Sequence, residues 1–271
     1  MILRGLESAA NGMLSLIEQH DNIANNLANV NTTGYKRTAL TFKNIMDSNI
    51  YENKGTLLDG ETRNLGNLSV GSEVQKLTYD FSQGTLMRTD NPFDLALEGD
   101  GFFKVRGNKS GEISYTRNGS FTLDRSKFIM TKEGEYLLDQ NNRPIKIDIS
   151  ELDMNNNNQF TVNEKGQIEI NGRYGKTPIE QRVAIYDFED KEKLFNVGGS
   201  KFVSKDMESN PPIPAEKFTI VQGHLEASNA NVIREMLNTI NTSRNYESLS
   251  KIVKTNNQLL SAALSVGRIK V

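Results

Sequence analysis

Histidine is the side chain most often used for proton transfer and metal binding near neutral pH, and this sequence has two, His20 and His224. A Ser-His-Asp arrangement or a histidine-based metal site needs further partners close to the imidazole. His20 lies within a long apolar-periodic stretch and His224 in a turn before a second such stretch. Nothing in the sequence brings the two together, so we predict no catalytic or metal-ligating role for either.

Two other segments look like ligand loops but lack essential parts. Residues 98–103, EGDGFF, have no third glycine, no Lys-Ser/Thr pair and no following helix, unlike a phosphate-binding loop. Residues 139–144, DQNNRP, begin like a calcium loop but lack its central glycine and its distal glutamate at the right spacing. We interpret both as turns, and the acidic residues around them as solvated charge. The sequence therefore predicts no enzyme activity, no metal and no cofactor.

Composition excludes several other classes. The 271 residues carry a net charge of −2, with Lys and Arg dispersed, so there is no electrostatic footprint for nucleic acid. The absence of cysteine excludes disulfides, thiolate catalysis and Cys-ligated zinc. No basic segment precedes a continuous apolar one at the N-terminus, and no long apolar run follows. We expect no cleaved signal peptide of the Sec type and no direct membrane insertion.

The first stretch that could position side chains is a long amphipathic helix ending near Val30, where Asn31-Thr32-Thr33-Gly34 gives a stop signal. Its apolar positions follow alternating spacings of three and four, typical of a narrow seam that another helix covers. These positions are Leu3, Leu6, Ala10, Met13, Ile17, Ala24 and Leu27, and only His20 breaks the apolar seam.

This helix is poor in charge. Arg4, Glu7, Glu18 and Asp21 are the only charged residues in 1–30, whereas the whole chain is 24% charged. Charge depletion is a feature of interface cores, which favours protein on more than one side of the helix. An ordinary amphipathic helix on a monomeric domain is the alternative.

A second long helix is predicted over residues 229–267, with Ser228 or Asn229 as its N-cap. It is also poor in charge. Its seam positions keep heptad-like spacing, and we expect the two helices to pair with each other because neither can bury its seam locally. The seam consists of Val232, Met236, Ser243, Tyr246, Ser250, Val253, Leu260 and Leu264, with Ile233, Leu237 and Ile240 broadening it.

Between the helices, residues 85–225 alternate apolar and polar side chains and contain many turn pairs, which predicts an all-β domain. Asn118-Gly119 is the strongest hairpin signal, and the segments 120–124 and 159–163 each predict the first strand of a hairpin. Residues 38–84 lack clear periodicity. We predict an extended connector there, irregular over 47–70, with Phe42, Ile45 and Met46 hinting at a short helical continuation.

The fold class predicted is therefore α+β, with paired, coiled-coil-like terminal helices, an inserted all-β domain and an extended arm. The predicted domains are 1–37 with 226–271 as a helical core, 38–84 as the connector arm and 85–225 as the β-rich domain.

Four segments, in this order, resemble the bacterial flagellar rod and hook axial family. They are ANNLANVNTTGYK at 24–36, DLALEGDGFF at 94–103, YTRNGSF at 115–121 and GHLEASN at 223–229. The departures from the family pattern are His20 within the seam and Ala230 after the last motif. The length suits a basal-body rod protein, of proximal or distal type, better than the longer hook protein.

The resemblance implies a structural subunit that self-assembles with copies of itself and with other rod and hook-side axial proteins into the drive shaft linking motor to hook. It also implies export by the flagellar type III apparatus, without a cleaved signal peptide, to the rod in the periplasmic space; the basal-body rings are further candidate partners. The residues expected at subunit interfaces are Leu3, Leu6, Met13, Ile17, Asn25, Asn26, Leu27, Asn29, Val232, Met236, Ile240, Tyr246, Val253, Leu260 and Leu264.

Two other functions fit the residues less well. A monomeric ligand-binding β-domain with a helical clasp predicts that both end helices are folded in the isolated chain. A cell-wall hydrolase with a carboxylate pair in 85–225 predicts that one Asp or Glu substitution abolishes bond cleavage while leaving assembly intact.

Overall fold

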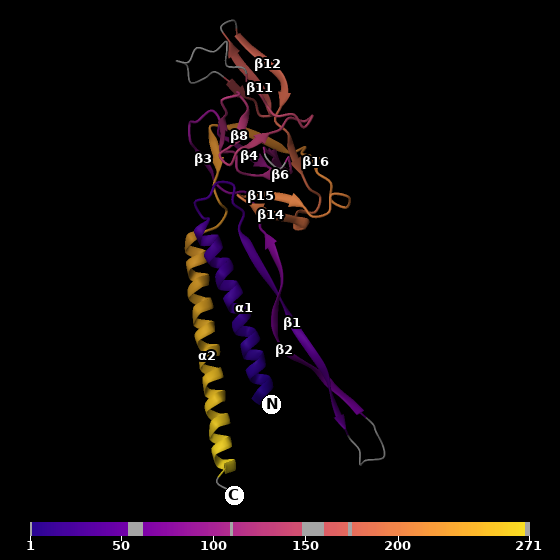
Figure 1. Cartoon of the computed structure of the whole chain (residues 1–271), viewed down its shortest axis with the longest axis vertical. Helices are drawn as coiled ribbons and strands as arrows, with labels where there is room; N and C mark the ends of the chain where they lie inside the picture. Colours follow the sequence, from indigo (N-terminus) through magenta and orange to yellow (C-terminus); the bar gives the residue numbers. More distant parts are fainter. Residues whose placement is uncertain (1, 54–61, 109–110, 148–159, 173–174, 269–271) are drawn as a thin grey trace. The chain divides into compact units, whose positions relative to one another are not determined.

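The computed structural model describes residues 2–53, 62–108, 111–147, 160–172 and 175–268 (Figure 1). Side chains are described for 5–43, 73–108, 111–147, 160–170 and 180–265. The chain divides into two units: residues 1–28, 38–78 and 231–271 form the helical unit, and residues 29–37 and 79–230 form the β-rich unit. A helix near each end of the chain and a mostly β middle make the fold α+β, as predicted.

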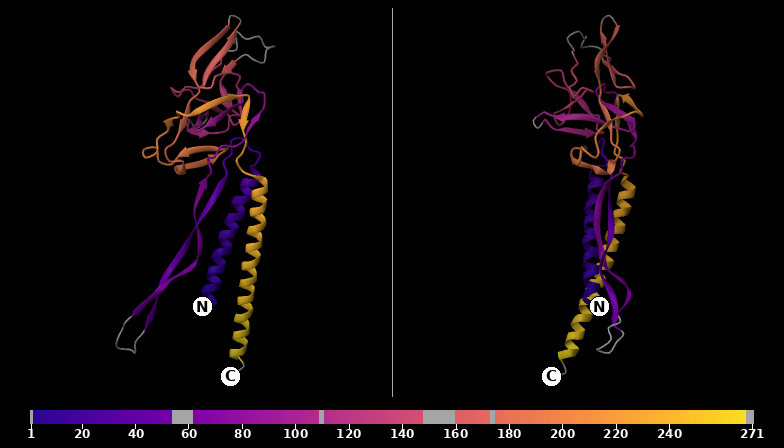
Figure 2. Two further views of the ribbon diagram at one scale, coloured as in Figure 1. Left: turned by 180° about the vertical axis from the view of Figure 1, so that it is seen from behind. Right: turned by 90° about the vertical axis from the view of Figure 1, so that its right-hand side faces the viewer.

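Two long helices and a two-stranded ribbon make up the helical unit. Helix α1 spans Ile2–Ala28 and α2 spans Val232–Arg268, and the two lie side by side (Figures 1 and 2). Helix α2 begins three residues later than predicted, because Asn231 caps it: the Arg234 N–H donates to Asn231 Oδ1 at 3.1 Å. Asn229 is not the cap, since its amide is used elsewhere in the β-rich unit.

The predicted connector is more regular than expected. Strands β1, Thr38–Asn53, and β2, Thr62–Tyr79, pair as a ribbon, so the irregular segment and the short helix expected around Phe42 are wrong where the structure describes them. Residues 54–61 lie outside the described residues. Thr78 Oγ1 donates to the Ala39 carbonyl at 3.2 Å across the ribbon. Strand pairing joins residues that are far apart in the sequence, so the local spacing of apolar residues does not reveal it.

The β-rich unit contains one large sheet. Among the described residues it has nine strands, with the path β14-β15-β6-β5-β9-β8-β7, while β13 joins β5 and β16. Their bounds are β5 Phe102–Gly107, β6 Ile113–Thr116, β7 Phe121–Leu123, β8 Ile129–Thr131, β9 Glu135–Leu137, β13 Ile185–Asp187, β14 Leu194–Gly198, β15 Lys201–Ser204 and β16 Ile213–Pro214; a short 3₁₀ helix, Lys191–Lys193, precedes β14.

Smaller antiparallel groups complete this unit. They are β10 Phe160–Val162, β11 Gln167–Gly172 and β12 Gly175–Arg182; β17 Phe218–Gln222 with β4 Leu95–Gly99; and β18 His224–Glu226 with β3 Leu86–Arg88. Both expected hairpins are present as β7–β8 and β10–β11.

The expected hairpin at Asn118-Gly119 is wrong, because β6 pairs with β5 and β15 but not with β7. Glycine is needed at 119 for close approach instead: a Cβ there would lie 1.6 Å from the Leu95 carbonyl oxygen. The Leu95 N–H donates to the Gly119 carbonyl at 3.0 Å.

Two apolar clusters hold the β-rich unit together. The larger cluster contains Leu97, Phe103, Phe121, Ile129 and Leu137, all buried. The smaller one is aromatic, with Phe102, Tyr115, Phe188 and Phe202 buried together. Tyr115 and Phe188 meet edge to face at 4.9 Å between ring centroids, a favoured aromatic geometry.

Candidate functional site

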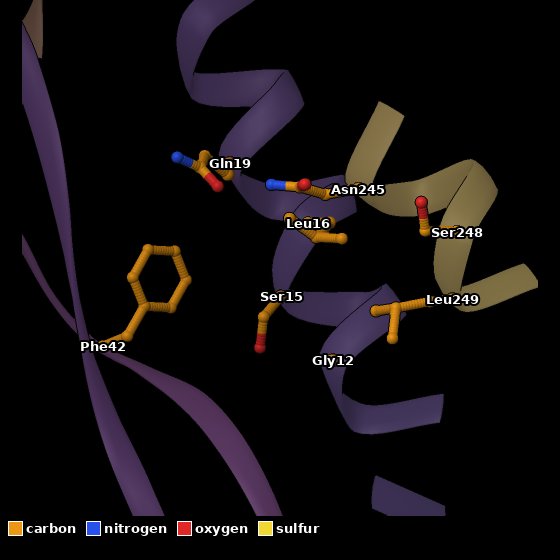
Figure 3. A pocket seen from close by; sticks show the side chains of 8 residues that line it. All are labelled: Gly12, Ser15, Leu16, Gln19, Phe42, Asn245, Ser248 and Leu249. Atoms are coloured by element: carbon orange, nitrogen blue, oxygen red, sulfur yellow. The ribbon is translucent and has the colours of Figure 1, made fainter. Parts of the chain in front are cut away.

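Gly12 of α1 and Leu249 of α2 meet where the two helices lie side by side. Ala9, Ser15 and Ile23 are buried on α1, and Glu235 and Thr242 are buried on α2. Close approach explains the glycine: a Cβ added at Gly12 would lie only 3.2 Å from Leu249 Cδ1. In Figure 3, Leu16 and Leu249 lie between the two helices.

The predicted apolar seam faces α2 only in part. On α1, Ile17 is 44% exposed, and Ala10, His20 and Ala24 are exposed too, although Ile17 and His20 line a groove together with Ser243 and Tyr246 of the α2 seam. The α1 residue that meets Leu249 is Gly12, which is not a seam position. Of the remaining α1 positions, Leu6, Met13 and Leu27 are half-buried, while Leu3 lies outside the residues with described side chains.

Large apolar side chains stay exposed along α2. Ile233, Leu237 and Ile240 are 72%, 56% and 48% exposed, and their spacing of four and three places them on one face. The predicted seam residues Val232, Met236, Tyr246, Leu260 and Leu264 are also exposed, and Val253 is half-buried. An exposed apolar face of this kind marks a surface for protein–protein contact.

One groove beside the helix pair, of about 420 Å³, is lined by Gly12, Ser15, Leu16, Gln19, Phe42, Asn245, Ser248 and Leu249. Figure 3 shows Phe42 facing α1 across this groove from β1. Another groove, of about 280 Å³, is lined by Leu16, Ile17, His20, Thr242, Ser243, Tyr246 and Glu247.

Asn26 fixes the start of the ribbon against α1. Its Oδ1 accepts the Thr38 N–H at 2.9 Å, and its Nδ2 donates to the Thr38 carbonyl at 2.8 Å. Thr38 Oγ1 also donates to Asn22 Oδ1 at 2.6 Å. Asn26 is buried by these contacts, whereas Asn25 is exposed and Asn29 half-buried. The Asn26 carboxamide thus bonds both the backbone N–H and the carbonyl of Thr38, as a neighbouring strand would.

A buried ion cluster lies in the β-rich unit, where three of the four motifs contribute a charged side chain. Lys36 Nζ lies 2.7 Å from Glu226 Oε1, and Arg117 Nη1 lies 3.3 Å from Glu226 Oε2. The side chains of Lys36 and Glu226 are 1% exposed and that of Arg117 is 3% exposed. Arg117 Nη2 also donates to the carbonyl of Gly99 at 2.8 Å, and Gly99 belongs to the remaining motif, residues 94–103.

Burial lowers the pKa of Lys36, while the carboxylate of Glu226 acts in the opposite direction. Lys36 Nζ also donates to the Ser82 carbonyl at 2.8 Å. The cluster is therefore a hydrogen-bonded structural site, in which each ion has been taken out of water and paired.

Backbone contacts tie the same motifs together. Gly34 donates its N–H to the Glu226 carbonyl at 2.8 Å, and Thr33 Oγ1 donates to Asn118 Oδ1 at 2.9 Å. Gly34 has a positive φ of 66°, and a Cβ on it would lie 2.4 Å from the backbone nitrogen of Asn118. Only glycine fits there without strain.

Asn229 joins the remaining segments of this junction. Its Oδ1 accepts the Arg37 N–H at 2.7 Å, and its Nδ2 donates to the Asp80 carbonyl at 2.7 Å. Sequence reasoning noted the motifs but did not predict these contacts. The available signal was the placement of Lys36, Arg117 and Glu226 within motifs otherwise rich in small and polar residues.

The segments that resembled ligand loops are turns. Asp139 Oδ1 accepts the N–H groups of Asn141 and Arg143 at 2.8 and 2.7 Å, which closes the turn on itself. His20 lies on α1 and His224 lies on β18. The ring nitrogen Nδ1 of His224 lies 3.1 Å from the Gln222 carbonyl oxygen. Within the described residues, no group of three or more His, Cys, Asp or Glu side chains is arranged to hold a metal ion.

Among the parts of the chain that the structure describes, no helix combines the length and the apolar character needed to span a membrane.

Three family models match separate parts of the chain. Residues 6–36 match the flagella basal body rod protein model, residues 96–170 the D1 domain of flagellar hook protein FlgE/F/G, and residues 221–266 the C-terminal part of flagellar basal body rod FlgEFG proteins. The first and last of these regions include most of α1 and α2.

Curated relatives match over nearly the full length. The flagellar basal-body rod protein FlgG of Borreliella burgdorferi is 31% identical, over 98% of this chain and 100% of the relative. That of Bacillus subtilis is 28% identical, again over 98% and 100%. That of Buchnera aphidicola subsp. Schizaphis graminum is 32% identical, over 88% and 90%. The chain therefore belongs to the family of flagellar basal-body rod proteins, and it is a structural subunit of the rod that links motor to hook.

Proposed function

We propose that this rod subunit is built into the axial structure through the outer faces of its end helices, which pair with each other as a coiled-coil-like unit. The observation that carries the proposal is the row of large apolar side chains exposed on α2, together with Leu14 and Ile17 on α1. Covering these side chains with neighbouring subunits gives a favourable free energy that the single chain does not gain.

The residues proposed for subunit contacts are Leu3, Leu6, Met13, Ile17, Asn25, Leu27, Asn29, Val232, Met236, Ile240, Tyr246, Val253, Leu260 and Leu264. Asn26 contributes indirectly, because both polar atoms of its amide bond Thr38 within the same chain.

Contacts between different faces of successive copies extend an assembly without closing it, as a shaft requires. The partners are copies of this chain and other flagellar axial proteins, with the basal-body rings as further candidates. The family is a structural one rather than an enzyme class, and relatives named as rod proteins give the monomeric ligand-binding alternative no support.

A gene deletion tests the role directly. Cells lacking the gene should not swim, and an epitope-tagged copy should restore swimming and remain with purified basal bodies after a high-salt wash. Unimpaired swimming of the deletion strain, in the absence of a second related gene, would contradict the proposal.

We also propose that the chain reaches the periplasmic part of the flagellum through the flagellar type III export apparatus. Membership of the flagellar basal-body rod family supports this route, because the resemblance to that family implies export through the flagellum's own apparatus. In cells whose type III export gate is disabled, the chain should stay in the cytoplasm, whereas azide inhibition of Sec should leave its export unchanged. Azide-sensitive export that survives loss of the gate would refute this route.

A further inference from the structure

Glu226 holds segments that are far apart in the sequence. One carboxylate oxygen, Oε1, accepts hydrogen bonds from Lys36 Nζ at 2.7 Å and from the Gly84 N–H at 2.9 Å. The other, Oε2, accepts from Arg117 Nη1 at 3.3 Å. Lys36 follows the first helix along the chain, Glu226 precedes the second, and Arg117 belongs to the large β-rich segment between them.

Removing either residues 33–37 or residues 223–230, the two terminal segments, from this site leaves buried charge behind. If the segment that carries Glu226 leaves, the cations of Lys36 and Arg117 lose the carboxylate they share. If the segment that carries Lys36 leaves, a carboxylate that is 1% exposed loses its closest cation. Loss of Glu226 leaves two buried cations without their counterion, and loss of Lys36 leaves the Glu226 carboxylate with only the longer contact to Arg117, so both are unfavourable.

We infer that Glu226 couples the docking of the two terminal segments, residues 33–37 and 223–230, onto the β-rich unit. Each segment is held more tightly when the other is docked, and this effect is reciprocal by thermodynamic necessity. Glu226, Lys36 and Arg117 are then positioning residues for both of these segments. The coupling goes beyond the rod function, because it acts in the single chain before assembly.

Hydrogen exchange measured by mass spectrometry on the purified full-length chain tests the coupling. The variants are Lys36→Met, Glu226→Gln and the double variant. The far-side reporter for Lys36→Met is the amide of Ala227, which donates to the Thr85 carbonyl at 2.9 Å; for Glu226→Gln it is the amide of Tyr35, which donates to the Thr32 carbonyl at 3.3 Å. Each single variant should speed exchange at its own segment roughly a hundredfold, as expected for a broken buried ion pair, and at the far segment about tenfold or more.

The double variant should exchange little faster than the faster single variant, because one interaction has been removed in all three proteins. Lys201→Met is the matched control. Lys201 pairs with Glu135 at 2.7 Å and Glu133 at 2.9 Å, within the β-rich unit but away from both terminal segments in sequence. Its loss should leave exchange at 33–37 and 223–230 within about twofold of the wild type.

The inference is overturned if Lys36→Met speeds exchange at 33–37 alone, or if the effects of the two single variants multiply in the double variant. Should Glu226→Gln unfold the β-rich unit, Lys36→Met and the charge-retaining Lys36→Arg decide the question. Lys36→Arg should then exchange more slowly at Ala227 than Lys36→Met, and equal exchange in both would refute the coupling. None of these readouts depends on rod assembly, so the proposed function can fail without affecting the result.

Discussion

Replacing Leu237 with lysine should prevent assembly without unfolding the chain. The side chain is 56% exposed in the single chain, on the same face of α2 as Ile233 and Ile240. Lysine and leucine have similar helix propensities, and a substitution at an exposed site changes the free energy of unfolding by about 0.5 kcal/mol or less. The Leu237→Lys chain should therefore fold like the wild type.

The effect on assembly is larger. Complete burial of a leucine side chain gives about 1.5–3 kcal/mol, so covering the exposed half of Leu237 gives about 1–1.5 kcal/mol at each subunit contact. A lysine ammonium covered by the same neighbour also has to leave water without a partner, at a cost of several kcal/mol. The sum exceeds about 3 kcal/mol, which is more than a hundredfold in the association constant for each contact.

The assay combines folding and motility. Thermal unfolding followed by circular dichroism should give the same midpoint for both chains, within the error of the measurement. In a strain lacking the chromosomal copy, the wild-type chain should restore swimming in soft agar, whereas Leu237→Lys should not. Leu237→Met, which keeps a large apolar side chain at the same position, is the matched control and should swim. Normal swimming by Leu237→Lys, or equal loss with Leu237→Met, would refute the reasoning.

Three further predictions concern stability. Burial, with a smaller effect of the Tyr186 charge, raises the pKa of Tyr115 from 10.0 to about 12, so the unfolded chain loses this proton first as the pH rises. Denaturant titrations should show roughly 3 kcal/mol of stability that is fully present below pH 10 and is lost towards pH 12. Tyr115→Phe should remove that part of the pH dependence. Asn26→Ala leaves two backbone groups of Thr38 without their partners, at about 1–3 kcal/mol each; amide exchange at Thr38 should accelerate accordingly, and unchanged exchange would exclude the role given to the carboxamide. Gly34→Ala should lower the unfolding free energy by about 2 kcal/mol more than Gly111→Ala. The two glycines have similar φ, 66° and 70°, but a Cβ at Gly34 would clash with the backbone of Asn118, whereas a Cβ at Gly111 would have nothing within 4 Å. Equal losses in thermal melts would contradict this.

The overall architecture could be predicted from the sequence because its signals are local. The apolar period of 3.6 residues predicted long helices near both ends, and alternation in segments such as 121–123 predicted strands that the structure contains. The same reasoning did not include Gly12, which meets Leu249 in the α1–α2 contact. Apolar periodicity identifies a face that avoids water, but it does not tell whether the same chain or another subunit covers that face.

The ribbon and the ion cluster could not be predicted because each depends on residues far apart in the chain. Strand β1 pairs with β2 across a gap of more than thirty residues at Thr78 and Ala39, and Lys36 meets Glu226 across 190. Asn26 was expected to be an interface hydrogen bonder, but sequence alone gave no sign that its partner is Thr38, at the start of the ribbon.

The central claim, that the exposed helix faces contact neighbouring subunits, is tested most directly by photo-crosslinking in assembled basal bodies. A benzoylphenylalanine in place of Leu237 keeps a large apolar group at this position and reacts with whatever covers it. Irradiated basal bodies from swimming cells should contain this chain joined to another copy or to a second axial protein, with the crosslinked peptide from an end helix. If the chain remains uncrosslinked in functional basal bodies, this face of α2 is not covered by a neighbour and the account is wrong.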